Sequence, residues 1–380
     1  MALTQDMERY VQSVQDEVQQ IVRDLCAIPA PSHHEEKRAE YCYNWFTANG
    51  FQNVSIDEAL NVLAPVGVTQ DNKITIYMAH TDTVFPEMTQ LPFSEDETYM
   101  YSPGVNDDTA NLAVLMVCAR YFKDHFKGGT DGVLFAANSC EEGLGNLKGT
   151  RKIMETFAGR VKEFITVDGV TFPRFVTCAV GSHRYKVTVR TEGGHSYANF
   201  GNRNAIHVLS SMISLLYTVK VPQEGSSKTT YNVGTISGGT SVNTIAQDAS
   251  MMYEYRSDNK NCLAAMQKFF EQTVETFRAS GVTVEVEMVG CRPCTGDMDE
   301  ESFSRLKERI ARSIRETFGT EPFEASSSTD ANIPLSLGIP AVCICGCKGT
   351  GCHTREEKLE KSSLLPGCRY VLDVINGTSL

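Results

Sequence analysis

His80 and Asp82 stand one residue apart where the apolar run 74–79 ends. Alternate residues of a strand share a face, so both side chains can point the same way. Histidine is a common ligand of transition metals, and a neighbouring carboxylate can hold its second ring nitrogen. A lone His-x-Asp more often marks a polar strand end, so a metal site here depends on what other segments supply.

Acidic residues end two further apolar segments of the same kind. Glu141 and Glu142 follow the run 132–137, and Asp168 follows the run 163–167. Adjacent side chains diverge, so one member of the Glu141–Glu142 pair can bind a metal while the other stays available to take a proton. These segments therefore supply further candidates for metal ligands.

Two adjacent acids, Asp107 and Asp108, precede a predicted apolar helix. A single carboxylate there would be explained as a helix cap, which the helix macrodipole favours. Two exceed that need, so we expect one to cap the helix and Asp107 to coordinate or bridge metal ions. A second imidazole, His353, follows the predicted strand 340–345 and its glycines.

The carboxyl ends of parallel strands meet at one edge of a sheet, where ligands bind in open α/β folds. Five carboxylates that converge there cannot all stay ionised without compensating cations. The five are Asp82, Asp107, Glu141, Glu142 and Asp168. Two imidazoles with carboxylates and no thiolate suit Zn²⁺, with Co²⁺ or Mn²⁺ as feasible substitutes.

Strands and helices alternate around these residues, which predicts an α/β domain with helices packed on a mixed, mostly parallel sheet. The predicted strands are 73–79, 132–137, 163–167 and 340–345, and the predicted helices are 107–123, 148–157 and 302–318. Two helices precede them. One spans the apolar positions from Met7 to Leu25, and the other begins at Ser32, with Glu35 completing a capping box.

The alternation breaks after Gly181. The predicted strands 185–190, 229–236, 248–256 and 282–287 and the predicted helices 203–219 and 258–280 form a smaller α+β unit. We therefore expect a discontinuous catalytic domain, 1–181 with 293–380, and an inserted domain, 182–292.

The overall composition excludes several classes of protein. The chain has 380 residues, 41% of them hydrophobic, and a net charge of −12, which disfavours nucleic acid and anionic membranes as partners. No secretory signal pattern opens the sequence and no apolar run reaches membrane-spanning length. We expect a cytoplasmic protein.

Thirteen cysteines, scattered and odd in number, fit a reducing compartment. Cys291–Cys294 and the group Cys343, Cys345, Cys347 and Cys352 are weak candidates for a zinc or redox site, since no second Cys-x-x-Cys completes them. Period-two spacing places the first three of that group on one face of the predicted strand. The glycines of 143–149 resemble a dinucleotide-binding turn, but carboxylates stand where a pyrophosphate would approach.

Six motifs in order resemble the M20 family of metallopeptidases, and most closely its peptidase T-like branch. They are His80-Thr-Asp82, Gly104-Val-Asn-Asp-Asp108, Glu141-Glu-Gly143, Val167-Asp-Gly169, Gly193-Gly-His-Ser196 and His353. The resemblance implies two zinc ions bridged by Asp107. One ion would be completed by His80 and Asp168, and the other by Glu142 and His353. Glu141 would be the general base, and Asp82 would orient His80.

The resemblance also implies roles for the inserted domain, as a lid and as the dimerisation module of a homodimer. His195 would reach the active site of a partner subunit and stabilise the tetrahedral oxyanion. Asn243, which ends Gly238-Gly-Thr-Ser-Val-Asn243, and Arg256, in Tyr253-Glu-Tyr-Arg256, would grip the substrate carboxylate.

These features predict a two-zinc hydrolase of short peptides, best described as an aminopeptidase acting on tripeptides. A dipeptidase or an N-acyl amino acid deacylase on the same zinc core remains open. A non-catalytic binding protein and a thiol-dependent redox protein using Cys291 and Cys294 are the weaker alternatives.

Overall fold

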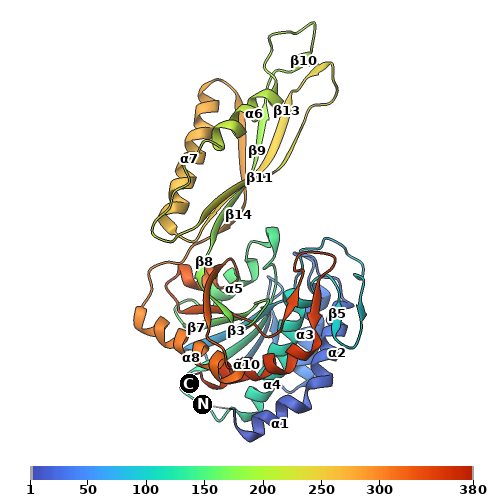
Figure 1. Cartoon of the computed structure of the whole chain (residues 1–380), viewed down its shortest axis with the longest axis vertical. Coiled ribbons are helices and arrows are strands. Elements are labelled where there is room, and N and C mark those ends of the chain that lie inside the picture. Colours follow the sequence, from blue (N-terminus) through green and yellow to red (C-terminus); the bar gives the residue numbers. More distant parts are fainter. Residues whose placement is uncertain (1–2, 379–380) are drawn as a thin grey trace. The chain divides into compact units, whose positions relative to one another are not determined.

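The computed structural model describes residues 3–378, which fall into two compact units (Figure 1). One is built from the chain up to Ala179 and from Gly296 onward, and the other from Val180–Thr295. The prediction of a mixed, mostly parallel sheet with an inserted unit is confirmed. Among residues 3–378, no helix has both the length and the apolar character needed to cross a bilayer.

An eight-stranded sheet forms the centre of the first unit. Its order is β1 (Ser55–Ile56), β2 (Val62–Val66), β6 (Gly132–Asn138), β3 (Ile74–His80), β7 (Val161–Val167), β16 (Ala341–Ile344), β8 (Arg174–Ala179) and β15 (Phe323–Ser327). Strands β6, β3, β7 and β16 are parallel neighbours. Strand β2 runs antiparallel to β6, and β8 runs antiparallel to β16 but parallel to β15. Every residue of β3 and β6 is buried, which explains their unbroken apolar sequences.

Helices of the first unit pack on this sheet and on each other. They are α1 (Gln5–Ser13), α2 (Gln15–Cys26), α3 (Glu36–Ala48), α4 (Asn111–His125), α5 (Lys148–Thr156), α8 (Glu300–Phe318), α9 (Asn332–Ser336) and α10 (Leu364–Asn376). Helix α4 contacts β3, β7, α2 and α10, and α8 contacts α10 and β16. The short helical segments are the π-helix η1 (Val105–Ala110) and the 3₁₀ helices η2 (Gly143–Gly145) and η3 (Lys361–Ser363).

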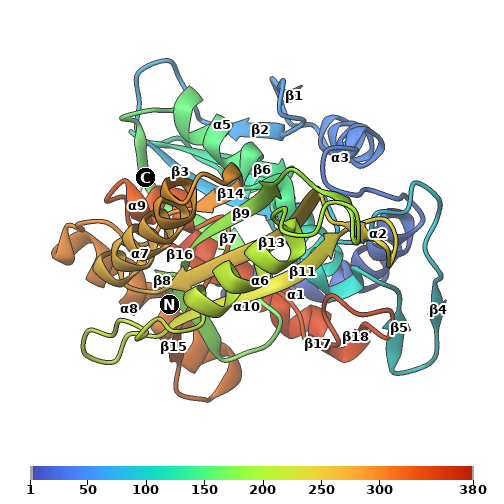
Figure 2. The same cartoon turned by 90° about the horizontal axis from the view of Figure 1, so that it is seen from above.

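A second sheet of very short strands lies at one side of this unit, at the lower right of Figure 2. Its order is β17 (Gly349–Thr350), β18 (Lys358–Glu360), β5 (Tyr99–Tyr101) and β4 (Ser94–Glu95). Because β18 pairs with β5, the segment around His353 is held beside the segment that leads into η1.

The second unit is a four-stranded antiparallel sheet with two helices. Its order is β11 (Thr229–Gly238), β13 (Asp248–Ser257), β9 (Gly181–Arg190) and β14 (Thr283–Arg292). Helices α6 (Ala205–Leu216) and α7 (Lys260–Ala279) cover alternate buried residues of β13 and β9. A two-stranded ribbon, β10 (Gly194–His195) with β12 (Thr244–Ile245), belongs to the same unit (Figure 1).

Three local expectations are wrong. The first helix is broken at Val14, whose ψ of 4° departs from helical geometry, so α1 and α2 are separate. Ser32 caps no helix, because its hydroxyl donates to the Asp82 carboxylate, and α3 starts at Glu36 without a side-chain cap. Strand β16 ends at Ile344, so Cys345 and Cys347 lie beyond it.

Candidate metal centre

Three neighbouring strands of the large sheet deliver side chains to the same edge. His80 is the last residue of β3, Asp168 follows β7, and Glu141 and Glu142 follow β6. The three strands are parallel, so their carboxyl ends coincide. The structure thus brings these four residues together at the edge that the sequence indicates.

Asp107 and His353 reach the same place through the short-stranded sheet. Asp107 lies in η1, a few residues after β5, and His353 lies in the loop between β17 and β18. His353 has a φ of 64°, in the left-handed region that a non-glycine residue rarely occupies. Its side chain is 57% exposed, whereas that of His80 is fully buried.

The Asp107 carboxylate lies between the two imidazoles. Its Oδ1 is 3.2 Å from Nε2 of His80, and its Oδ2 is 3.1 Å from Nε2 of His353. Each ring also faces a second carboxylate, since Asp168 Oδ1 lies 3.7 Å from Nε2 of His80 and Glu142 Oε1 lies 3.2 Å from Nε2 of His353. Asp107 is therefore placed to bridge two cations.

The negative surroundings shift the pKa of both imidazoles. Burial acts to lower the pKa of His80, but Asp108 and Asp107 outweigh it, and the pKa lies well above the usual value. The Asp107 and Glu142 carboxylates raise the pKa of His353 to about 10. Burial raises the pKa of Asp168 to about 6. The site strongly favours bound cations.

The donor set fits divalent metal ions. Ligand atoms approach within 4.8 Å of one another in three groups: His80, Asp107, Asp108 and Asp168; His80, Glu141 and Glu142; and Asp107, Glu142 and His353. Five carboxylates thus face two imidazoles. Oδ1 of Asp108 is buried and accepts no hydrogen bond within the described chain, which is costly unless a cation compensates. No cysteine of residues 3–378 joins these groups.

Comparison with known proteins places this site in a family. Residues 76–377 match the model for peptidase family M20/M25/M40. The chain belongs to this family. The sequence resemblance to the M20 metallopeptidases is confirmed.

Relatives of this M20 chain include curated and solved proteins. It is 25% identical over 346 residues to succinyl-diaminopimelate desuccinylase from Corynebacterium glutamicum, a match that covers 89% of this chain and 90% of the relative. The solved tripeptidase from Staphylococcus aureus has a TM-score of 0.74 at 22% identity, covering 95% of this chain and 97% of that one. Aminopeptidase PepT from Bacillus cereus has a TM-score of 0.71 at 22% identity, with coverage of 95% and 98%. These structural likenesses show the fold.

Asp82 anchors the two glutamates of this M20 site. Its carboxylate accepts the backbone N–H groups of Glu141 and Glu142, each at 3.0 Å, and the hydroxyl of Ser32 at 2.6 Å. Nδ1 of His80 lies 3.0 Å from the backbone carbonyl oxygen of Asp82 and 3.4 Å from its carboxylate. Asp82 therefore touches His80 from both backbone and side chain, as well as fixing the segment that carries Glu141.

Asp108 does not cap a helix, contrary to expectation. Neither η1 nor α4 begins with a side-chain cap, and Oδ2 of Asp108 accepts the backbone N–H of His80 at 2.9 Å. The role of Asp108 therefore differs from the helix cap that the sequence predicts. Asp107 faces the imidazoles, and Asp108 holds the end of β3.

Sequence reasoning missed Glu357, which is 1% exposed. Its carboxylate accepts the backbone N–H groups of Gly104 at 2.7 Å, Asn106 at 2.8 Å and Asp107 at 2.9 Å. Burial raises the pKa of Glu357 to about 7, while the three N–H groups act to lower it. No local signal marks this residue, because only the pairing of β18 with β5 brings it to η1.

We expect Glu357→Gln to weaken metal binding and lower kcat, each by about 10–100-fold, as loss of a group that supports a metal ligand commonly does. The amide nitrogen of Gln cannot accept the N–H groups of the η1 loop, so Asp107 loses its support. Metal content after dialysis and kcat measure the effect. The matched control is Glu356→Gln, at an exposed neighbour, and equal behaviour of the two variants would contradict this role.

The remaining predicted site residues lie in the second unit. Nδ1 of His195, an exposed residue of β10, accepts the backbone N–H groups of Tyr197 and Ala198 at 3.3 Å, which leaves Nε2–H as the donor of this ring. The backbone carbonyl of Asn243 accepts the N–H of Ser196 at 2.9 Å, so His195 and Asn243 share one ribbon.

Arg256, in β13 of this unit, is paired with Glu254. Its Nε and Nη2 lie 3.1 and 3.0 Å from the two carboxylate oxygens of Glu254. Cys294 donates to the backbone carbonyl of Ser257, and no cysteine among residues 3–378 belongs to a group that could hold a metal ion.

Proposed function

We propose that this chain is a two-zinc aminopeptidase that removes the first residue of short peptides, with tripeptides as its substrates. The observation that carries the proposal is the position of Asp107, with one oxygen toward His80 and the other toward His353. Asp168 beside the first ring and Glu142 beside the second complete two similar sets of ligands.

In this mechanism His80 and Asp168 would hold one zinc ion, and Glu142 and His353 would hold the other. Asp107 would bind both ions. Bound zinc ions lower the pKa of a water molecule and polarise the scissile carbonyl. Glu141 takes the proton of the attacking water and later gives it to the leaving amine. Asp82 supports this step, because it holds the backbone N–H of Glu141 at 3.0 Å.

The inserted unit would act as the lid and the dimer interface. Nε2–H of His195 is available to donate to a developing oxyanion in a partner subunit. Large apolar side chains are exposed in and beside its ribbon: Tyr197 at 89%, Phe200 at 91% and Val242 at 102%. Such residues suit an interface between two copies, in which Asn243 and Arg256 would bind the substrate carboxylate.

A second candidate is an amidase of N-acyl amino acids or a dipeptidase. It is favoured by the match to succinyl-diaminopimelate desuccinylase over 89% of this chain, and by a shorter one, 34% identical over 90 residues, to cytosol non-specific dipeptidase from Escherichia coli. The same metal centre would cleave these amides. We place the enzyme in the cytoplasm, where free thiols persist.

Hydrolysis of tripeptides, dipeptides and N-acyl amino acids by zinc-loaded protein tests these proposals. We expect release of the amino-terminal residue from tripeptides, its loss on chelation and its return when zinc is restored. Activity confined to acylated amino acids or to dipeptides would support the second candidate. Hydrolysis that survives complete chelation would refute both.

A further inference from the structure

A cavity of about 770 Å³ lies in the first unit, away from the metal centre. Lys162 and Glu163 at the start of β7 line it, whereas Asp168 follows the end of that strand. Glu163 and Asp168 are five positions apart along an extended segment, which corresponds to about 17 Å. The cavity therefore cannot belong to the metal centre.

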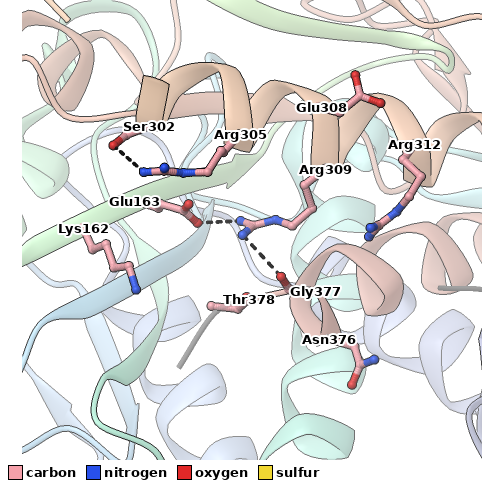
Figure 3. Close-up of a pocket in the computed structure, with 10 residues that line it drawn as sticks. All are labelled: Lys162, Glu163, Ser302, Arg305, Glu308, Arg309, Arg312, Asn376, Gly377 and Thr378. Atoms are coloured by element: carbon pink, nitrogen blue, oxygen red, sulfur yellow. Dashed lines mark hydrogen bonds and ion pairs between the residues drawn. The ribbon is translucent and has the colours of Figure 1, made fainter. Parts of the chain in front are cut away.

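Helix α8 supplies most of the positive charge of this cavity. Arg305, Arg309 and Arg312 follow one another at intervals of four and three residues, so they share one helix face. In Figure 3 all three extend from the same side of α8, and Glu308 points away from them. Glu308 is also ion-paired with Arg315, at 3.4 Å.

Arg309 and Arg312 each have a buried N–H donor that no acceptor contacts within residues 3–378. The side chain of Arg309 is only 10% exposed; its Nη2 contacts Glu163 at 2.7 Å, but its Nε is buried without an acceptor within residues 3–378. Nε of Arg312 is likewise buried without an acceptor in that part of the chain. Burial raises the pKa of the Asp373 carboxyl, in α10, while the charge of Arg312 acts to lower it.

The other cations at the rim have carboxylate neighbours outside the cavity. Lys162 contacts Asp131 at 2.7 Å, and Arg305 contacts Glu301 at 2.7 Å. Among the ten residues that line the cavity, four are basic and two are acidic, in a chain whose net charge is −12. A gathering of cations against the overall charge, with buried donors unused, indicates a place for an anion.

We propose that this cavity binds a small oxyanion with two or more negative charges, carried by phosphate or carboxylate groups. Planar guanidinium groups match both in paired hydrogen bonds. The lining adds the polar groups of Ser302, Asn376 and Thr378. It contains no aromatic side chain, so it offers no stacking surface for a nucleobase, and the ligand is a non-aromatic polyanion.

Calorimetric titration of the zinc-loaded protein at constant ionic strength tests this site, with inorganic phosphate in one arm and citrate in the other. We expect saturable binding of at least one anion, weakened about 10-fold or more in Arg312→Gln. Arg305→Gln, at a side chain that is 64% exposed, gives the same test should Arg312→Gln fail to fold. Binding of phosphate alone or of citrate alone shows whether the site recognises phosphate or carboxylate groups.

The matched control is Arg315→Gln, on the same helix but outside the cavity lining, which we expect to bind as the wild type does. Both anions can also bind zinc, and that binding would be equal in all variants. Equal affinity of the wild type, Arg312→Gln and Arg305→Gln would overturn the proposal, as would the absence of saturable binding of either anion.

Discussion

The Asp107→Asn variant is expected to lose its bound metal and its hydrolytic activity together. The amide keeps only one oxygen, so it cannot present one carboxylate oxygen to each half of the site, and the site loses a negative charge. Removal of a group that only supports a metal ligand lowers metal affinity by about 10–100-fold. Loss of the shared ligand should therefore cost at least about 100-fold.

Metal content by elemental analysis after dialysis, with kcat/KM measured on the same samples, checks this prediction. Asp71→Asn, at an exposed acid of the same unit, is the matched control and should retain metal and activity. Full metal content with normal activity in Asp107→Asn would mean that Asp107 does not bridge the ions.

Glu141→Gln is expected to separate activity from metal binding. The variant should retain its metal, because the proposed ligands are unchanged and the backbone N–H of Glu141 still reaches Asp82. Its kcat should fall by about 10²–10⁴-fold, the range that a general base contributes. Turnover of the preferred substrate and metal content are the two measurements.

The two measurements also distinguish other roles for this residue. Since Glu141 shares a ligand group with His80 and Glu142, loss of metal in Glu141→Gln would identify it as a ligand. Near-normal turnover would instead place the base elsewhere. Together with Asp107→Asn, this variant tests which carboxylates bind metal and which one moves protons.

The convergence of His80, Glu142 and Asp168 could be predicted because it follows from local sequence. Each of the strands β3, β6 and β7 contains an apolar run that ends in a polar residue or is followed by one, and parallel strands share one carboxyl edge. The strands of the inserted unit could be predicted for a similar reason, because buried residues alternate with more exposed ones, as in β13.

Features that depend on distant partners could not be predicted. Strand β18 has three residues and β5 has three, too few for a pattern, yet their pairing across some 250 residues brings Glu357 to Asp107. Ser32 looked like a helix cap because its real partner, Asp82, lies 50 residues away.

Helix α10 was missed because its start, Leu-Leu-Pro-Gly, resembles a turn. Proline is tolerated in the first turn of a helix, where its missing N–H costs nothing. Gly367 is required by packing, since a Cβ there would lie 1.6 Å from the carbonyl oxygen of Gly346. Gly346 and Gly367 are 21 residues apart, so the local sequence around either one does not indicate their close approach.

The place of β16 between β7 and β8 has a consequence for the order of folding. Residues 341–344 complete the middle of a sheet whose other central strands end by residue 179, so about 160 residues are synthesised before that gap is filled. The inserted unit, whose sheet uses only residues 181–292, can fold on the ribosome during this interval. His353 emerges later still. The proposed metal centre therefore lacks His353 until the segment after β16 has been synthesised, well after the strands β3, β6 and β7 that lead to its other ligands.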